Sequence, residues 1–212
     1  MNWSQPKVYA VKHKDEEIRA ASRSGGIFTA LSDLVLDDGG TVYGCVLTDD
    51  FHAVHVRTDS RDGRNQMRGS KYIQSKMGDT YKKVQEDLNA KREVLFSGTS
   101  CQVAGLKHFL GKDYDNLICI DIVCHGVPSP VVWDKYLRWQ EHKNHGKVVK
   151  VDFRNKKDFG WKDHVETIWF DNGKNVSSPI FKNLFYGHMV LRPSCYECPY
   201  KSIMHHCLLY TS

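Results

Sequence analysis

The sequence lacks the features that mark membrane proteins, secreted proteins and nucleic-acid-binding proteins. No apolar run approaches the roughly 20 residues that a helix needs to cross a bilayer, and the first ten residues show no signal-peptide core. The net charge of +5 is small and the basic residues are scattered, which does not favour a nucleic-acid surface. We therefore expect a cytoplasmic protein that spans no membrane and binds no nucleic acid.

Cysteine is the residue type that is present in an informative number. The chain has 7 cysteines, an odd count, and a reducing cytosol argues against a disulfide framework, so metal binding or catalysis is favoured. The stretch R-P-S-C-Y-E-C-P, Arg192 to Pro199, contains a C-x-x-C pair that can bring two thiolates to one metal or one cluster. The proline that follows is typical of ferredoxin runs. A zinc ribbon would need a second C-x-x-C, which the sequence lacks.

Two thiolates are too few for a closed site, so other ligands must complete it. Cys101 lies in G-T-S-C-Q at the start of a predicted helix, where the helix dipole favours a thiolate. Cys124 lies in D-I-V-C-H-G-V-P at the end of a predicted strand, where sites in α/β sheets assemble. These two are the natural candidates, and the alternatives are Cys207, His205 and His206. Cys45 and Cys119 lie inside apolar strands and are interpreted as core residues.

Three further stretches combine glycine with hydroxyl or basic residues. S-R-S-G-G, Ser22 to Gly26, precedes a helix, so its backbone N–H groups can meet an anion. Taken alone, the stretch favours a plain helix cap with a tight turn, with Ser24 as N-cap. R-G-S-K-Y-I-Q-S, Arg68 to Ser75, suits a pyrophosphate or the polar edge of a flavin, or else is a solvated basic loop. The S-R-S-G-G stretch is not a G-x-G-x-x-G fingerprint, so a Rossmann dinucleotide site is not supported.

The order of predicted elements indicates an α/β fold: a mixed sheet core with helices on its faces, followed by an antiparallel, strand-rich extension. Apolar periodicity predicts a helix after Gly26 and helices around 81–88, 101–110 and 130–141. Ser129 and Pro130 form a predicted N-cap and first turn. The predicted strands are 41–47, 51–57, 93–97, 116–123, 148–154, 165–170 and 174–179. We expect residues 1–145 to form the α/β core and 146–212 the strand-rich extension with the C-x-x-C, packed as one unit.

Together these stretches resemble the beta-subunit family of coenzyme F-420 hydrogenases and dehydrogenases. The resemblance runs from about residue 20 to 200 and rests on strings in the family's order: S-R-S-G-G-I-F-T-A-L, R-G-S-K-Y-I-Q-S, V-L-F-S-G-T-S-C-Q, C-H-G-V-P-S-P, F-R-N-K and R-P-S-C-Y-E-C. Compared with the family's pattern, we expect the chain to lack the N-terminal ferredoxin-like domain of many relatives and to be truncated after its C-x-x-C.

The resemblance implies an iron–sulfur flavoprotein that passes electrons between a [4Fe–4S] cluster and FAD. Hydride exchange with a deazaflavin, coenzyme F-420, or another soluble acceptor is the implied reaction, and the implied partner is a ferredoxin-like or hydrogenase/dehydrogenase electron-transfer protein. Homo-oligomerisation is left open, and no catalytic residue is assigned. The implied flavin contacts are Ser22, Ser24, Gly25, Gly26, Arg68, Gly69, Ser70, Lys71, Tyr72, Gln74, Ser75, Gly98 and Thr99. The implied cluster ligands are Cys101, Cys124, Cys195 and Cys198.

Two other functions stay open at the level of sequence. The cysteines would suit a zinc-thiolate structural or interaction module without redox turnover. Alternatively, Cys101 with His125 would suit a thiol enzyme. Iron content, zinc content and the effect of alkylating the thiol separate the three hypotheses.

Overall fold

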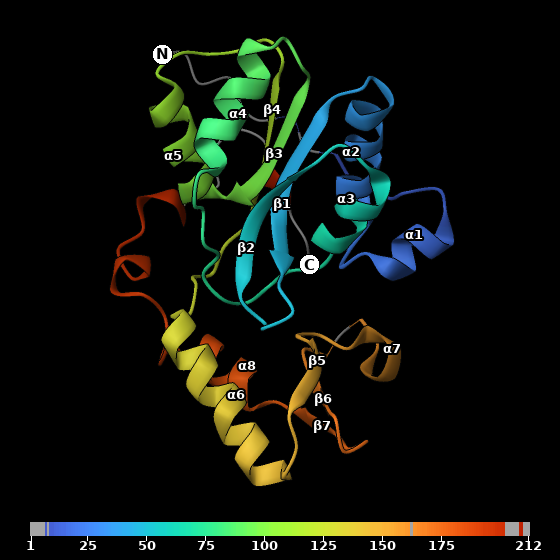
Figure 1. Cartoon of the computed structure of the whole chain (residues 1–212), viewed down its shortest axis with the longest axis vertical. Coiled ribbons are helices and arrows are strands. Elements are labelled where there is room, and N and C mark those ends of the chain that lie inside the picture. Colours follow the sequence, from blue (N-terminus) through green and yellow to red (C-terminus); the bar gives the residue numbers. More distant parts are fainter. Residues whose placement is uncertain (1–6, 8, 162, 202–207, 210–212) are drawn as a thin grey trace.

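The computed structural model describes residues 7, 9–161, 163–201 and 208–209, and it contains two sheets (Figure 1). The first sheet has the strand order β2-β1-β3-β4-β8. Its strands are β1 (Thr41–Leu47), β2 (Ala53–Thr58), β3 (Val94–Thr99), β4 (Leu117–Ile122) and β8 (Leu208–Leu209). β1 and β2 form an antiparallel hairpin, while β1, β3, β4 and β8 pair in parallel. The parallel strands run downward in Figure 1, so their carboxyl ends face the second sheet.

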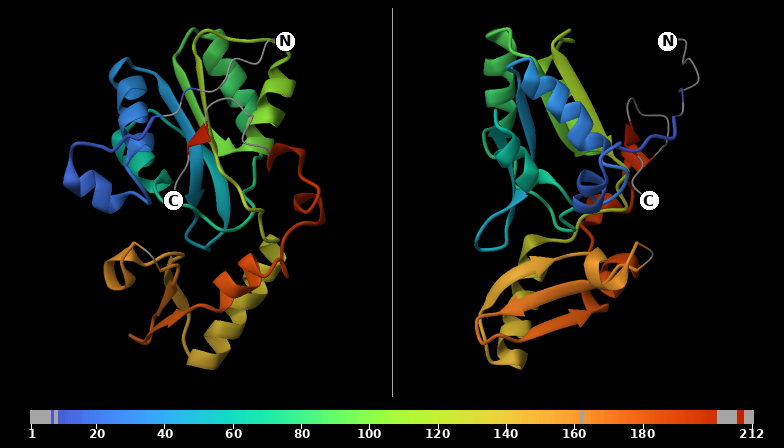
Figure 2. Two further views of the ribbon diagram at one scale, coloured as in Figure 1. Left: turned by 180° about the vertical axis from the view of Figure 1, so that it is seen from behind. Right: turned by 90° about the vertical axis from the view of Figure 1, so that its right-hand side faces the viewer.

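Helices cover both faces of the first sheet (Figure 2). On one face α2 (Ile27–Asp37) and α3 (Arg61–Met67) pack on the core cluster that includes Val42 and Leu95. On the other face α4 (Thr80–Asn89) and α5 (Ser100–Leu110) pack on the cluster that includes Tyr43 and Phe96. Successive side chains of β1 and β3 thus alternate between the two cores, as expected for a sheet that is covered on both faces.

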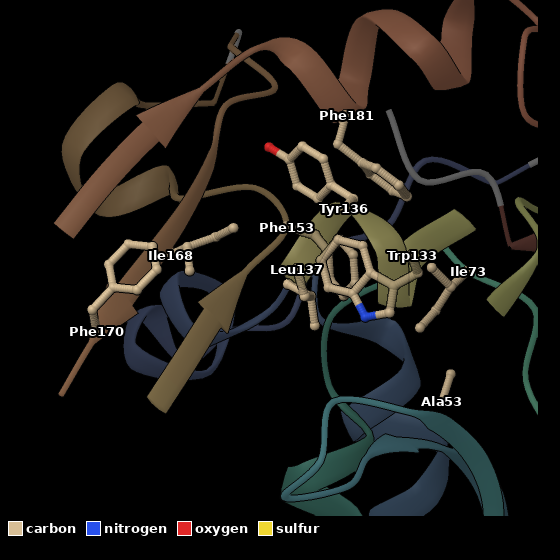
Figure 3. Packing of buried hydrophobic residues seen from close by; sticks show 9 residues of the cluster. All are labelled: Ala53, Ile73, Trp133, Tyr136, Leu137, Phe153, Ile168, Phe170 and Phe181. Carbon is tan, nitrogen blue, oxygen red and sulfur yellow. The ribbon is translucent and has the colours of Figure 1, made fainter. Parts of the chain in front are cut away.

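The second sheet is antiparallel and is covered by α6 (Pro130–Asn144). Its strands are β5 (Val148–Asp152), β6 (Glu166–Phe170) and β7 (Asn175–Ser178), and α8 (Ile180–Tyr186) follows them. The core of this layer is aromatic: Trp133 and Tyr136 of α6 meet Phe153, Phe170 and Phe181 (Figure 3). The short helices are α1 (Glu16–Ala21), α7 (Lys156–Phe159), η1 (Pro193–Cys195) and η2 (Pro199–Lys201).

The two layers share apolar contacts. Ala53 of the hairpin and Ile73 of the loop after α3 belong to the same buried cluster as Trp133. The indole Nε1 of Trp133 also donates a 2.9 Å hydrogen bond to the carbonyl of Phe51. None of the helices in the described part of the chain is long and apolar enough to cross a membrane.

The predicted fold class is confirmed: the structure has a mixed sheet with helices on its faces and a separate antiparallel sheet. The strand predicted at 41–47 and the helix that Ser129 caps are formed as expected. The prediction of Ser24 as N-cap of α2 is wrong, because Gly26 takes that position with φ 80° and no side-chain cap. No sequence pattern indicated α3, a polar helix with only Met67 as a buried apolar residue.

Candidate functional site

A cavity of about 710 Å³ lies at the carboxyl ends of β3 and β4. Its walls come from the turn 22–28, the loop 67–77, the β3–α5 junction 97–102 and the segment 120–127. The antiparallel layer adds Arg154, and α8 adds Phe185 and Tyr186. The cavity therefore forms where the parallel strands end, which is the position expected of ligand sites in such sheets.

The cavity gathers almost all residues that were implied as flavin contacts. The lining residues among them are Ser22, Ser24, Gly26, Arg68, Gly69, Ser70, Lys71, Tyr72, Gln74, Ser75, Gly98 and Thr99. Gly25 is not among the lining residues. It serves the turn instead, because a Cβ there would lie 2.7 Å from the carbonyl oxygen of Val11. The backbone N–H of His13 also donates to the Gly25 carbonyl at 2.6 Å.

The lining of the cavity is strongly cationic. Five of its residues are basic, and they are Arg23, Arg68, Lys71, Arg154 and Arg192. None of the described lining residues is an aspartate or glutamate. Basic side chains between low-dielectric walls raise the local concentration of anions, so the cavity is suited to a negatively charged ligand.

The side chain of Lys71 contacts the C-terminal end of α3. Its Nζ donates to the carbonyls of Gln66, Met67 and Arg68 at 3.1, 3.1 and 3.2 Å, at the end of α3 where carbonyls lack helical partners. Burial lowers the pKa of Lys71 to about 8. Burial also lowers the pKa of the Arg68 guanidinium, with Arg64 as a second cause.

The start of α5 is tied to the basic loop by one side chain, Gln102. Its Oε1 accepts a 2.9 Å hydrogen bond from the backbone N–H of Thr99, and its Nε2 donates to Ser75 Oγ at 2.8 Å. The Tyr81 hydroxyl donates to the Gln102 carbonyl at 2.8 Å. Gly98 permits this close packing, since a Cβ there would lie 3.1 Å from Gln102 Oε1.

The four cysteines implied as cluster ligands come from three segments of the chain, and Cys195 and Cys198 share one of them. Cys101 is exposed near the start of α5, and Cys124 is partly buried in the loop after β4. Both line the cavity, whereas Cys195 and Cys198 do not. The pKa of the Cys124 thiol is raised to about 11, mainly by burial and in part by the neighbouring thiols of Cys101, Cys195 and Cys198. That coupling places all four in one neighbourhood.

Backbone pairing holds the two C-terminal cysteines near the other two. The N–H of Arg192 donates to the Val127 carbonyl at 3.0 Å, and Leu191 forms an isolated bridge with Pro128. A Cβ on Gly126 would lie 3.4 Å from the Cβ of Cys195. On the other side of the C-x-x-C, η2 packs against α5.

The described donor side chains do not converge on a single point. Among the described residues, no group of three or more Cys, His, Asp or Glu converges closely enough to hold one metal ion. A tetrahedral zinc site needs four ligand atoms within roughly 2.0–2.3 Å of the metal. The alternative ligands Cys207, His205 and His206 lie outside the described residues.

Cys101 and His125 have different surroundings. Cys101 Sγ lies 3.2 Å from Thr99 Oγ1. The His125 ring packs against the rings of Phe185 and His188, with centroids 5.0 and 4.6 Å apart. The thiol of Cys101 therefore has a hydroxyl neighbour, whereas the imidazole of His125 packs against other rings.

The sequence did not mark every residue that lines the cavity. Four lining residues lie within the quoted motifs but were not assigned a role: Arg23, Gln102, Arg154 and Arg192. Their place next to predicted site residues was the sequence signal that could have identified them. His55 carried no such signal. Cys119 packs against the core as predicted, but Cys45 packs against the core and also lines the cavity.

Comparisons with known proteins bear on this site. The family described as the C terminus of the coenzyme F420 hydrogenase/dehydrogenase beta subunit matches residues 91–204, more than half of the 212 residues. None of the curated proteins compared with the chain matches it. A chain of the F420-reducing [NiFe] hydrogenase complex from Methanosarcina barkeri is similar in fold, with a TM-score of 0.59 at 17% sequence identity. That likeness covers 90% of this chain and 66% of the archaeal one.

Proposed function

Because the chain belongs to the coenzyme F420 hydrogenase/dehydrogenase beta-subunit family, we propose that it is an oxidoreductase that binds FAD and a [4Fe–4S] cluster. The observation that carries the proposal is the cationic cavity of about 710 Å³, which Cys101 and Cys124 line, with Cys195 and Cys198 close to Cys124. Its reaction is electron transfer between the two cofactors, with hydride exchange to a deazaflavin or another soluble acceptor.

FAD suits this cavity in charge and in composition. Its pyrophosphate is an anion, and Arg23 and Arg68 line the cavity. Arg23 also forms a 3.4 Å ion pair with Asp152, through Nη2. The Nε of Arg23 is buried and has no hydrogen-bond partner among the described residues, so it is a donor that a ligand oxygen can use. The hydroxyls of Ser22, Ser24 and Ser70 add further polar contacts along the same wall.

Cys101, Cys124, Cys195 and Cys198 would hold the cluster. When bound, FAD supplies hydride transfer and the cluster supplies single-electron transfer. The chain's own residues bind and orient these groups, and Phe185 and Tyr186 keep one wall of the cavity apolar. Cys101 is exposed, so this end of the site is open to a ferredoxin-like or hydrogenase/dehydrogenase electron-transfer partner.

The experiment is anaerobic reconstitution of the full chain with FAD, iron and sulfide. We expect FAD to bind at micromolar concentrations and iron to be retained. Cys→Ser changes at each of the four positions should lower the iron content, because each removes one ligand. Cys119→Ser is the matched control, since Cys119 is partly buried against the core and does not line this cavity.

Three results would contradict the proposal. If the protein binds no FAD at micromolar levels, the flavoprotein function fails. If zinc is found without iron, the structural module takes its place. If alkylation of Cys101 abolishes activity while the iron content is unchanged, the thiol enzyme is favoured.

A further inference from the structure

His55 of β2 is an almost completely buried residue in the wall of the cavity. Its side chain is 8% exposed, and its ring stacks on Phe96 with a centroid separation of 5.7 Å. Its Nε2 lies 3.1 Å from the carbonyl oxygen of Ser97, at the end of β3. The ring is therefore fixed by one stacking contact and one hydrogen bond.

This hydrogen bond determines the tautomer of His55. A carbonyl oxygen can only accept, so Nε2 must carry the proton. Burial lowers the pKa of His55 to about 4, so the ring is neutral at physiological pH. Nδ1 then has a free lone pair and acts as an acceptor.

No donor among the described residues uses this lone pair. Nδ1 of His55 is buried and lacks a hydrogen-bond partner there. Lys71, the charged group that acts on the ring, already donates to three carbonyls. Gln102 Nε2 donates to Ser75, and the Cys45 thiol, across the hairpin from His55, lies 3.7 Å from the Val46 carbonyl.

A buried acceptor without a partner weakens a folded protein, so a site that keeps one in a ligand cavity has a use for it. Lys71 does not meet this need, because its Nζ is engaged with three carbonyls. The remaining sources of a proton donor are a water molecule and the ligand itself, and a ligand that fills the cavity would displace the water. Since the cavity otherwise offers many donors and few acceptors, this acceptor selects one particular edge of the ligand.

We propose that His55 Nδ1 accepts a hydrogen bond from a ring N–H of the bound ligand and so makes the cavity specific for heteroaromatic rings with an imide-type N–H. The inference rests on the proposed function. The oxidised isoalloxazine ring of FAD carries one ring N–H, which lies between two carbonyls at N3. His55 is then a specificity-determining residue for the flavin, and it holds the ring without taking part in hydride transfer.

The test compares FAD with its N3-methyl derivative, which cannot donate from that edge. Binding of each to the reconstituted full chain is measured by the quenching of flavin fluorescence. We expect the wild-type protein to bind the methylated flavin about tenfold or more weakly, as is usual when a buried polar group loses its only partner. His55→Ala should bind both flavins with nearly equal affinity, whereas His55→Asn, which keeps an acceptor, should still prefer FAD. His108→Ala, at an exposed position of α5, is the matched control.

The outcomes separate this inference from the proposed function. Equal binding of both flavins by the wild-type protein overturns the role of His55 and leaves the flavoprotein function standing. An equal preference for FAD in the wild type and His55→Ala also overturns it, because the methyl group then clashes elsewhere. Binding of neither flavin refutes the proposed function, and the inference with it. Nitrogen NMR of the wild-type imidazole needs no variant: a proton on Nδ1 at neutral pH overturns the assignment as acceptor.

Discussion

Glu166 of β6 should make the stability of the protein fall as the pH rises, and Glu166→Gln should remove that effect. The Glu166 side chain is 2% exposed in the core beneath α6. Its Oε1 accepts a hydrogen bond from the Tyr136 hydroxyl, which in turn accepts from Gln140 Nε2 at 2.7 Å. Its Oε2 is buried and has no partner among the described residues. A neutral carboxyl group suits this position better than a carboxylate.

The sign of the effect follows from the direction of the shift. Burial raises the pKa of Glu166 from 4.5 to about 8, and the Tyr136 hydrogen bond offsets this in part. The folded protein therefore holds a proton that the unfolded chain releases. The stabilisation that this proton provides is complete below pH 4.5 and is lost as the pH rises through about 8.

The magnitude is large for a single group. A difference of one pKa unit corresponds to about 1.4 kcal/mol. The rise in the pKa of Glu166 from 4.5 to about 8 therefore corresponds to a loss of ~4–5 kcal/mol in the free energy of unfolding as the pH rises through this range. Glutamine keeps a carbonyl that can accept from Tyr136, and its NH₂ group resembles the protonated oxygen in size. The variant should therefore have a free energy of unfolding that varies much less between about pH 5 and 8.

Urea unfolding of the wild type and of Glu166→Gln over this pH range measures the effect. The difference in the free energy of unfolding should grow with pH in favour of the variant. Glu86→Gln, a change at an exposed glutamate of α4, is the control and should leave the wild-type pH dependence in place. If the curves of wild type and Glu166→Gln run parallel, the buried carboxyl does not titrate with folding and the reasoning is wrong.

Three further predictions concern the cavity and its surroundings. Arg23→Met should weaken FAD binding about tenfold or more, because it removes a charge-assisted donor, and a fluorescence titration measures this; unchanged affinity would place the pyrophosphate elsewhere. Gly126→Ala should lower thermal stability by ~1–3 kcal/mol and reduce iron retention, since Gly126 has φ 150° and a Cβ would lie 2.8 Å from Leu191 Cδ1. An unaltered melting temperature would refute that. Gln102→Ala should lower the free energy of unfolding, measured with urea, by ~1 kcal/mol, because the Thr99 N–H and the Ser75 hydroxyl lose their hydrogen-bond partner. Gln85→Ala on α4 is the control.

The central strands and helices were predictable because each follows a local rule. The helix α6 begins where Ser129 and Pro130 supply a cap and a first turn, and β1 has the bounds that its apolar run indicates. The helix α3 was not predictable from apolar periodicity, because it is polar apart from Met67 and depends on tertiary contacts, such as that of Arg64 Nη1 with the Thr29 carbonyl at 2.9 Å. Tertiary contacts of this kind override weak local propensity.

The candidate site was predictable where one motif carries several of its residues. The loop 68–75 and the β3–α5 junction reach the cavity as whole segments. His55 was not predictable, since an alternating strand gives no sign of which nitrogen will lack a partner. The division of the chain at residue 145 stays a prediction, although α6 shares its core with the antiparallel sheet rather than with the first one.

The span of the contacts around the cavity bears on how the chain reaches its folded state. The unit β3–α5–β4 closes within residues 94–122, so its contacts form between near neighbours in sequence. By contrast, Arg23 donates to the carbonyl of Arg154 and Lys156 donates to that of Ser22, across 131 and 134 positions. Contacts that close such long loops form late in folding, because the chain must lose conformational entropy before these contacts stabilise it. We therefore predict that the walls of the cavity are among the last parts of the chain to assemble.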